Sequence, residues 1–235
     1  AGHSKDVVDK VVHNSHTNPM DMARNFLDSG TLGQDFKIPS GVTSKSWHEL
    51  NKDYLALGDN KATFDEAMLA SIDRAARHNN LETNLWPTRR SNTDLDKTVN
   101  AARNIPEVKK LMDDMAKQYE ILLDYQKFRG VLSEAEVLKF KKSATGPDGR
   151  IAYMPIYHAD ETSFLQRMAK KYLMIGGKAQ REVNYLAEYA PRDLSKGGKM
   201  LTPMEAYQKY ALHVIADANE QSYKANVLQK LARID

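Results

Sequence analysis

The sequence predicts an all-α protein, an irregular assembly of several helices, some of them long, with little or no strand. Three observations lead to this prediction. Apolar residues recur at intervals of three and four along most of the chain, which is the spacing of one helix face. Residues that start helices and glycines that end them bracket these segments. Only one short segment has the character of a strand.

Four helices are predicted in the first eighty or so residues. Valines at helical spacing indicate the first, over residues 4–16, and the second covers residues 18–30, where Asn18 caps it, Pro19 takes the first helical position and Gly30 ends it. A loop rich in Gly and Pro follows and is expected to cross the surface. Two further helices, over residues 46–58 and 62–80, each close on Gly or Asn.

The clearest helical signal covers residues 92–130, after a break at Trp86-Pro87, where proline disfavours helix. Pro106 is expected to open its longer part, and Gly130 to stop it. One apolar stripe runs along this part, formed by Val108, Leu111, Met112, Met115, Tyr119, Leu122 and Leu123.

The second half of the chain begins with a capping box, in which Ser133 is followed by Glu136 three residues later. Residues 143–150 form a Gly-Pro-Asp-Gly turn. The segment 151–158 has strand character, and Pro155 restricts it to an edge or to a position outside a sheet. Helices are expected after residue 160, and a long closing helix starts with Thr202 as N-cap and Pro203 at its first position.

Composition excludes some classes of site. The 235 residues contain no cysteine, which excludes disulfides, thiolate zinc sites and a cysteine nucleophile. The net charge of +3 does not by itself imply nucleic acid, and no run approaches the roughly 18 apolar residues of a membrane span. The chain begins without Met and without an apolar leader, which favours a processed chain or a piece of a longer one.

No catalytic residue, bound metal or cofactor is predicted. His13 and His16 could share a helix face, with His3 or Asp9 as a third ligand, but the same residues fit a polar helix end. Asp113 and Asp114 are adjacent on a helix and so face different ways. Glu161 is the best candidate for a glycosidase acid, and its place also suits an ordinary helix N-terminus.

Basic residues gather in residues 139–199, where twelve Lys and Arg stand against six Asp and Glu. Such a stretch can touch phosphates without reading bases, and it can equally be a set of solvated helix faces. The residues predicted to contact nucleic acid are Lys139, Lys141, Lys142, Lys170, Lys171, Lys178 and Arg181.

Taken in order, the elements of residues 95–235 resemble the helical module of bacteriophage large polyvalent proteins, which include internal virion and DNA-ejection proteins. The resemblance begins with LDKTVNAARNIPEVKKLMDDMAKQYEILLDY and continues with GVLSEAEVLKF, the extended AYMPIYH and the closing TPMEAYQKYALHVIADANEQSYKANVLQKLARID. One departure stands after the Tyr-x-Pro, where the family often has Arg and this chain has Tyr157-His158. The chain accordingly divides into an N-terminal helical region, 1–92, and the module, 93–235.

The resemblance implies a structural protein of the virion interior that is delivered into the host cell envelope or cytoplasm and forms or lines a channel for genome delivery. Its expected partners are further copies of itself, portal, tail or ejection proteins, double-stranded phage DNA without sequence specificity, and the host envelope. Two alternatives stay open. The chain could be the accessory helical part of a large phage enzyme, of the lytic transglycosylase or virion RNA polymerase type, or a helical module that binds DNA non-specifically.

The closing helix also predicts self-association, because it carries apolar residues on more than one face and must be buried on several sides. A homo-oligomer would cover it, and so would the N-terminal helices of the same chain. The predicted interface residues are Tyr207, Tyr210, Val227, Leu228 and Leu231.

Overall fold

The computed structural model describes residues 19–152 and 201–231, apart from 33–34, 39–41, 82, 84 and 87. Within them the chain forms seven α-helices and one 3-10 turn, and its only β pairing is an isolated antiparallel bridge between Thr145 and Ile151. The all-α prediction is therefore confirmed. The helices are α2 (Pro19–Ser29), α3 (Trp47–Ala56), α4 (Lys61–His78), α5 (Asn92–Arg103), α6 (Pro106–Phe128), α7 (Glu134–Ala144) and α9 (Pro203–Leu231), with η1 (Gly58–Asn60) between α3 and α4.

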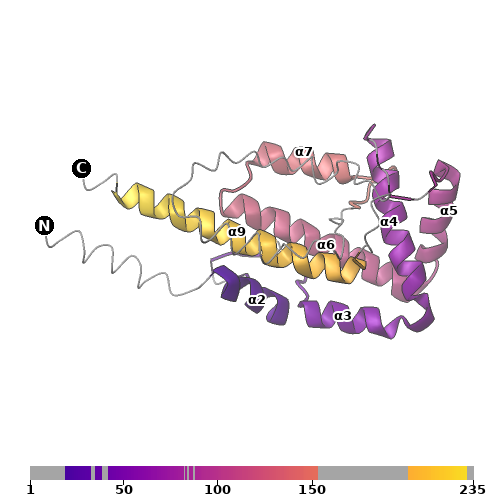
Figure 1. Ribbon diagram of the computed structural model, residues 1–235, viewed down its shortest axis with the longest axis horizontal. Helices are drawn as coiled ribbons and strands as arrows, with labels where there is room; N and C mark the ends of the chain where they lie inside the picture. The colour runs from indigo at the N-terminus through magenta and orange to yellow at the C-terminus, as the bar shows by residue number, and fades with distance from the viewer. Residues whose placement is uncertain are drawn as a thin grey trace, which may run out of the picture.

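The two longest helices, α6 and α9, pack against each other along the long direction of the molecule (Figure 1). α2 and α3 lie against α9, α7 lies against α6, and α4 and α5 form a pair at one end. The residues of the predicted stripe on α6 are all at most 5% exposed, which confirms that this face enters the core.

The helix boundaries follow the local signals in the sequence. Ser133 and Glu136 form the predicted capping box of α7, and Thr202 and Glu205 form a second one at the start of α9. Gly30 and Gly130 end α2 and α6 with positive φ angles of 73° and 72°. Ser46 also caps α3 with a box, through Glu49.

One hydrophobic core crosses the predicted boundary at residue 92. It takes Phe26 from α2, Leu50 from α3 and Phe64 from α4, together with Tyr119 from α6 and Tyr207 from α9. A small second cluster joins Ala70 of α4 to Leu95 and Val99 of α5. The two predicted regions thus share the same core.

Polar contacts made by Gln118 and Lys45 hold the segment that precedes α3 against this core. The buried amide of Gln118 on α6 donates to the Thr43 carbonyl and accepts from the Ser44 hydroxyl. Beside it, the Lys45 ammonium lies 2.6 Å from Asp53 on α3 and 2.8 Å from Asp114 on α6. The described part of the loop that the sequence predicts before α3 is therefore bound to α3 and α6 through its own backbone and through its side chains.

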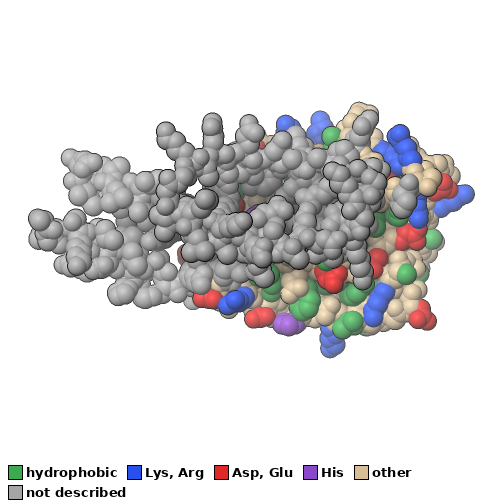
Figure 2. Space-filling model, viewed as in Figure 1, with side chains coloured by type: hydrophobic (Ala, Val, Ile, Leu, Met, Phe, Trp, Pro, Cys, Tyr) green, Lys and Arg blue, Asp and Glu red, His purple; other side chains and the backbone are tan. Residues whose placement is uncertain are grey.

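Charged side chains of both signs alternate over the described part of the face shown in Figure 2. None of the described helices combines the length and the apolar character that crossing a membrane requires. The proposed strand segment enters the described residues only at Ile151 and Ala152, and the Gly-rich segments 175–178 and 195–199 lie outside them.

Candidate functional site

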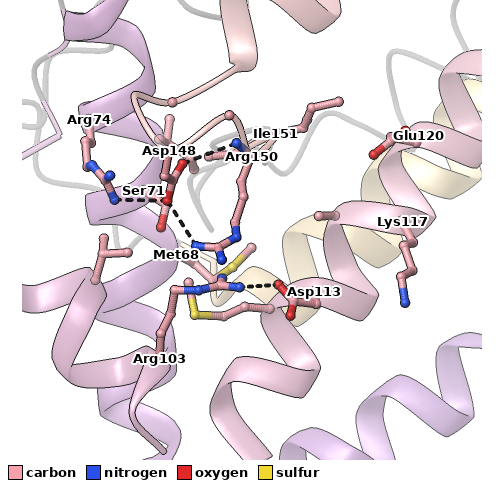
Figure 3. Close-up of a pocket in the computed structure, with 17 residues that line it drawn as sticks. Met68, Ser71, Arg74, Arg103, Asp113, Lys117, Glu120, Asp148, Arg150 and Ile151 are labelled. Carbon is pink, nitrogen blue, oxygen red and sulfur yellow. Dashed lines mark hydrogen bonds and ion pairs between the residues drawn. The ribbon is translucent and has the colours of Figure 1, made fainter. Parts of the chain in front are cut away.

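A cleft of about 490 Å³ lies between α4, α5, α6 and the turn that follows α7 (Figure 3). Its floor is apolar and its rim is charged. Met68, Ile72, Val99 and Met112 supply apolar surface, and the charged lining residues are Arg74, Arg103, Asp113, Lys117, Glu120, Asp148 and Arg150.

The turn after α7 brings Asp148 and Arg150 to the cleft. The Gly146 N–H donates to the Arg150 carbonyl at 2.8 Å, and the Ala152 N–H donates to the Ala144 carbonyl at 2.8 Å. The side-chain amide of Asn79, at the end of α4, donates to the carbonyls of Ser143 and Thr145. The end of α4 and residues 143–152, which lie far apart in the sequence, are thereby held together at one edge of the cleft.

Asp148 links two guanidinium groups across the cleft. Its Oδ2 lies 3.4 Å from Nη1 of Arg74 and 3.3 Å from Nη1 of Arg150 (Figure 3). Burial would raise the pKa of Asp148, but the Arg150 backbone N–H and the two guanidinium groups outweigh it, so this pKa lies below its ordinary value. The carboxylate is therefore ionised at neutral pH, and Arg74 also contacts Asp96 at 2.8 Å.

The deeper side of the cleft holds a second ion pair. Arg103 of α5 lies 2.5 Å from Asp113 of α6, and its side chain is only 12% exposed. On the same helix Lys117 faces Asp114 at 3.8 Å. Glu120 is reached by Lys141 of α7 at 3.7 Å.

The charges of the cleft cancel within the protein. Four cationic and three acidic side chains line it, and the contacts above add Asp96, Asp114 and Lys141 from just outside, which gives five charges of each sign. An ionic ligand would have to displace an existing partner. The pattern is that of helices tied together by ion pairs over an apolar floor.

The lining shows no arrangement for nucleophilic catalysis. Ser71, the one hydroxyl residue among the lining side chains, donates to the Ala67 carbonyl of its own helix at 2.8 Å. Among the described residues no group of three His, Cys, Asp or Glu side chains could hold a metal ion. His3, Asp9, His13, His16 and Glu161 lie outside those residues.

Asp113 and Asp114 face different ways, as predicted from their adjacency. Asp113 points into the cleft toward Arg103, whereas Asp114 contacts Lys45, Lys110 and Lys117. Asp114 shares Lys45 and Lys110 with Asp53, and these lysines neutralise both carboxylates, so Asp113 and Asp114 serve as ion-pair partners between elements.

The predicted nucleic-acid residues are only partly brought together. Lys139 and Lys142 are exposed on α7. Lys141 instead lies against α6, within 3.4 Å of Asp124, so its charge is already neutralised. The remaining four, Lys170, Lys171, Lys178 and Arg181, lie outside the described residues.

The predicted interface requires a correction at two positions. Tyr207 is fully buried and Tyr210 is 3% exposed, and both rings pack against Tyr119 with centroids 5.5 and 5.6 Å apart. The chain's own helices cover these two tyrosines, because α2, α3 and α6 surround the first half of α9. Val227, Leu228 and Leu231 lie on the second half of α9, and their interface role stays a prediction.

The sequence did not indicate the cleft. Arg74 and Asp148 are 74 positions apart, and neither belongs to a motif that predicts their contact. The one local signal was the Gly-Pro-Asp-Gly turn, which fixed the bend but not its neighbours.

The chain matches no protein-family model, no curated protein and no solved structure.

Proposed function

We propose that this chain is a structural helical module of an internal virion protein of a tailed phage, of the kind that is ejected with the genome. The observation that carries the proposal is the run of elements from α5 to α9. A capped α7 follows the Gly130 turn, a Gly-rich turn follows α7, and α9 starts at Thr202-Pro203, in the order of the resemblance. Helices α2, α3 and α4 complete the same core.

The charged residues support a scaffold role. In the cleft they pair across helices, and Lys45 with Asp53 and Asp114 does the same on the other side of α6. Exposed Lys139 and Lys142 remain for contact with phosphates, which suits weak, sequence-independent contact with DNA in transit.

Assembly with further copies is the second part of the proposal. The second half of α9 extends past the ends of α2 and α6 in Figure 1. This half carries Val227, Leu228 and Leu231 at helical spacing. Contact between such extensions would join protomers without disturbing the buried half of the helix.

Mass spectrometry of purified virions tests the virion role. The protein is expected there in many copies per particle, at a constant ratio to the capsid protein across preparations. A protein that is abundant in infected cells yet missing from purified particles would refute the proposal.

The self-association is tested separately on the full chain by light scattering coupled to size exclusion. Leu228→Asp combined with Leu231→Asp is expected to reduce the mass to that of one chain while leaving the helical circular dichroism unchanged. Leu55→Asp, at an exposed leucine of α3, is the matched control and should keep the mass. An unchanged mass in the α9 variant, or a wild-type chain that is already monomeric, would exclude this interface.

A further inference from the structure

Asp65 on α4 is a half-buried carboxylate at the junction where α4 shares the hydrophobic core with α3 and the first turn of α9. Its Oδ2 accepts a hydrogen bond from the Tyr54 hydroxyl at 3.0 Å. Its Oδ1 is buried and has no hydrogen-bond partner. A carboxyl group with one buried, unpaired oxygen is costly to ionise, because neither water nor a protein donor stabilises the negative charge on that oxygen.

The groups around Asp65 do not supply the missing positive charge. Glu205, across the junction on α9, has the same sign. Lys61, one turn earlier on α4, places its ammonium over the Tyr54 ring, 5.7 Å from the centroid. No side chain of α5, α6, α7 or η1 in the described chain makes a hydrogen bond or ion pair with Asp65.

These surroundings favour the protonated form of Asp65. Burial raises the pKa of Asp65 to about 6, the hydrogen bond from Tyr54 works in the opposite direction, and the charge of Glu205 adds to the rise. Because the folded protein holds this proton more tightly than the unfolded chain, the stability that protonation gives is fully present below the ordinary pKa of 3.8. It is lost as the pH rises through about 6.

The first turn of α9 is the part of the junction that ionisation would disturb. Glu205 caps it through Thr202, and Met204 and Tyr207 in the same turn are 2% and 0% exposed. Repulsion between Asp65 and Glu205 therefore acts on residues that seat α9 in the core.

We propose that Asp65 is a proton-operated latch: the first turn of α9 stays seated in the core that it shares with α4 when the Asp65 carboxyl is protonated, and it loosens when that carboxyl is ionised. The latch stands independently of the virion role, because it requires only the contacts of this junction.

Urea unfolding of the full chain between about pH 4.5 and about pH 8 tests the proton binding. The ratio of the unfolding constants of wild type and Asp65→Asn is expected to rise by about thirtyfold over this pH range, with a midpoint near pH 6. Asp59→Asn, at an exposed aspartate of η1, is the matched control and should give a flat ratio. A flat ratio for Asp65→Asn as well would overturn the latch.

Two neighbouring substitutions should move the midpoint in opposite directions. Glu205→Gln removes the like charge and still permits the capping box, so the midpoint is expected to fall. Tyr54→Phe removes the hydrogen bond that favours the ionised form, so the midpoint is expected to rise. Shifts of the same sign in both variants would contradict the assigned contacts.

Hydrogen exchange locates the effect. After correction for intrinsic rates, the amides of residues 206–210 in wild type should exchange faster at about pH 7.5 than at about pH 5, and Asp65→Asn should remove the difference. Equal protection at both values in wild type would show that ionisation does not reach α9. If the variants fold poorly, the carboxyl ¹³C shift of Asp65 in wild type decides the matter, since a titration near pH 4 would refute the proposal.

Discussion

The carboxylate of Asp73 is almost fully buried in α4, and four donors from three side chains reach its two oxygens. Arg77 donates through Nε and Nη2, at 2.8 and 2.7 Å, and Trp86 through Nε1 at 3.0 Å. The Thr83 hydroxyl donates as well. Arg90 stacks over the Trp86 ring at 3.9 Å. One side chain therefore fastens the irregular segment between α4 and α5.

Replacing this carboxylate should destabilise the protein. Asp73→Ala is expected to lower the free energy of unfolding by about 3 kcal/mol, because it leaves the Arg77 charge without its carboxylate and two further donors without a partner. Asp96→Ala removes an exposed partner of Arg74 and should cost less than about 1 kcal/mol. Urea unfolding at neutral pH measures both, and equal losses would contradict the role given to Asp73.

Two buried tyrosines differ in how their hydroxyl groups are satisfied. The Tyr125 hydroxyl donates to Asn219 of α9 at 2.7 Å and accepts from Arg129 at 3.0 Å. The Tyr207 hydroxyl is buried without a hydrogen-bond partner, and burial raises its pKa. An unpaired buried hydroxyl costs free energy, whereas a paired one does not.

Removal of these hydroxyl groups should therefore have opposite effects. Tyr207→Phe is expected to leave the free energy of unfolding unchanged or to raise it by up to about 1 kcal/mol, and Tyr125→Phe to lower it by about 1 kcal/mol or more. Thermal and urea unfolding check the pair. A clear loss of stability in Tyr207→Phe would indicate a partner for its hydroxyl.

At the scale of the helices, α2 and α6 both end at a glycine with a positive φ angle, but the surroundings of the two glycines differ. Gly30 and Gly130 both adopt positive φ angles, and residues other than glycine adopt such angles only at a cost in free energy. A Cβ on Gly130 would meet nothing within 4 Å, whereas one on Gly30 would lie 3.1 Å from backbone atoms of Lys45 and Ser46.

Substituting alanine at these two positions should distinguish the cost of the backbone angle from the cost of a steric clash. Gly130→Ala is expected to cost about 1 kcal/mol, from the backbone angle alone. Gly30→Ala adds a clash with backbone that cannot rotate away, so its cost is expected to reach about 3 kcal/mol. Equal losses in urea unfolding would mean that the Lys45-Ser46 segment moves aside freely.

At the scale of the whole molecule, residues on both sides of position 92 build one core. α9 packs against α2, α3 and α6, so the first and the last described helices lie together. Phe26 and Leu50 are buried there beside Tyr207. A core shared in this way predicts a single cooperative unfolding transition.

The fragment 93–235 should accordingly fail to fold as it does in the full chain. Without residues 1–92 it loses α2 and α3, which cover α9 together with α6, and α3 and α4, which pack against α6. An expanded state with poor dispersion in its proton–nitrogen spectrum is therefore expected. Mixing it with fragment 1–92 should restore part of the dispersion. A fragment that unfolds cooperatively by itself would establish 93–235 as a separate domain.

The sequence by itself determined the local structure of this protein. Capping residues and helix-ending glycines act within one turn, and the apolar stripe of α6 follows from spacing alone, so these features were predictable and are confirmed. Ser46 with Glu49 and Thr202 with Glu205 form two further boxes that the same pattern could have revealed.

Only the tertiary structure decided which charges meet and which faces are covered. Arg74 with Asp148 and Asn79 with the end of α7 join positions far apart in the chain, and no local spacing encodes such contacts. For the same reason the sequence shows that α9 has several apolar faces, but it does not show which elements cover them. Burial of Tyr207 and Tyr210 depends on how α2, α3 and α6 close around α9, and that is a property of packing among helices rather than of any one segment.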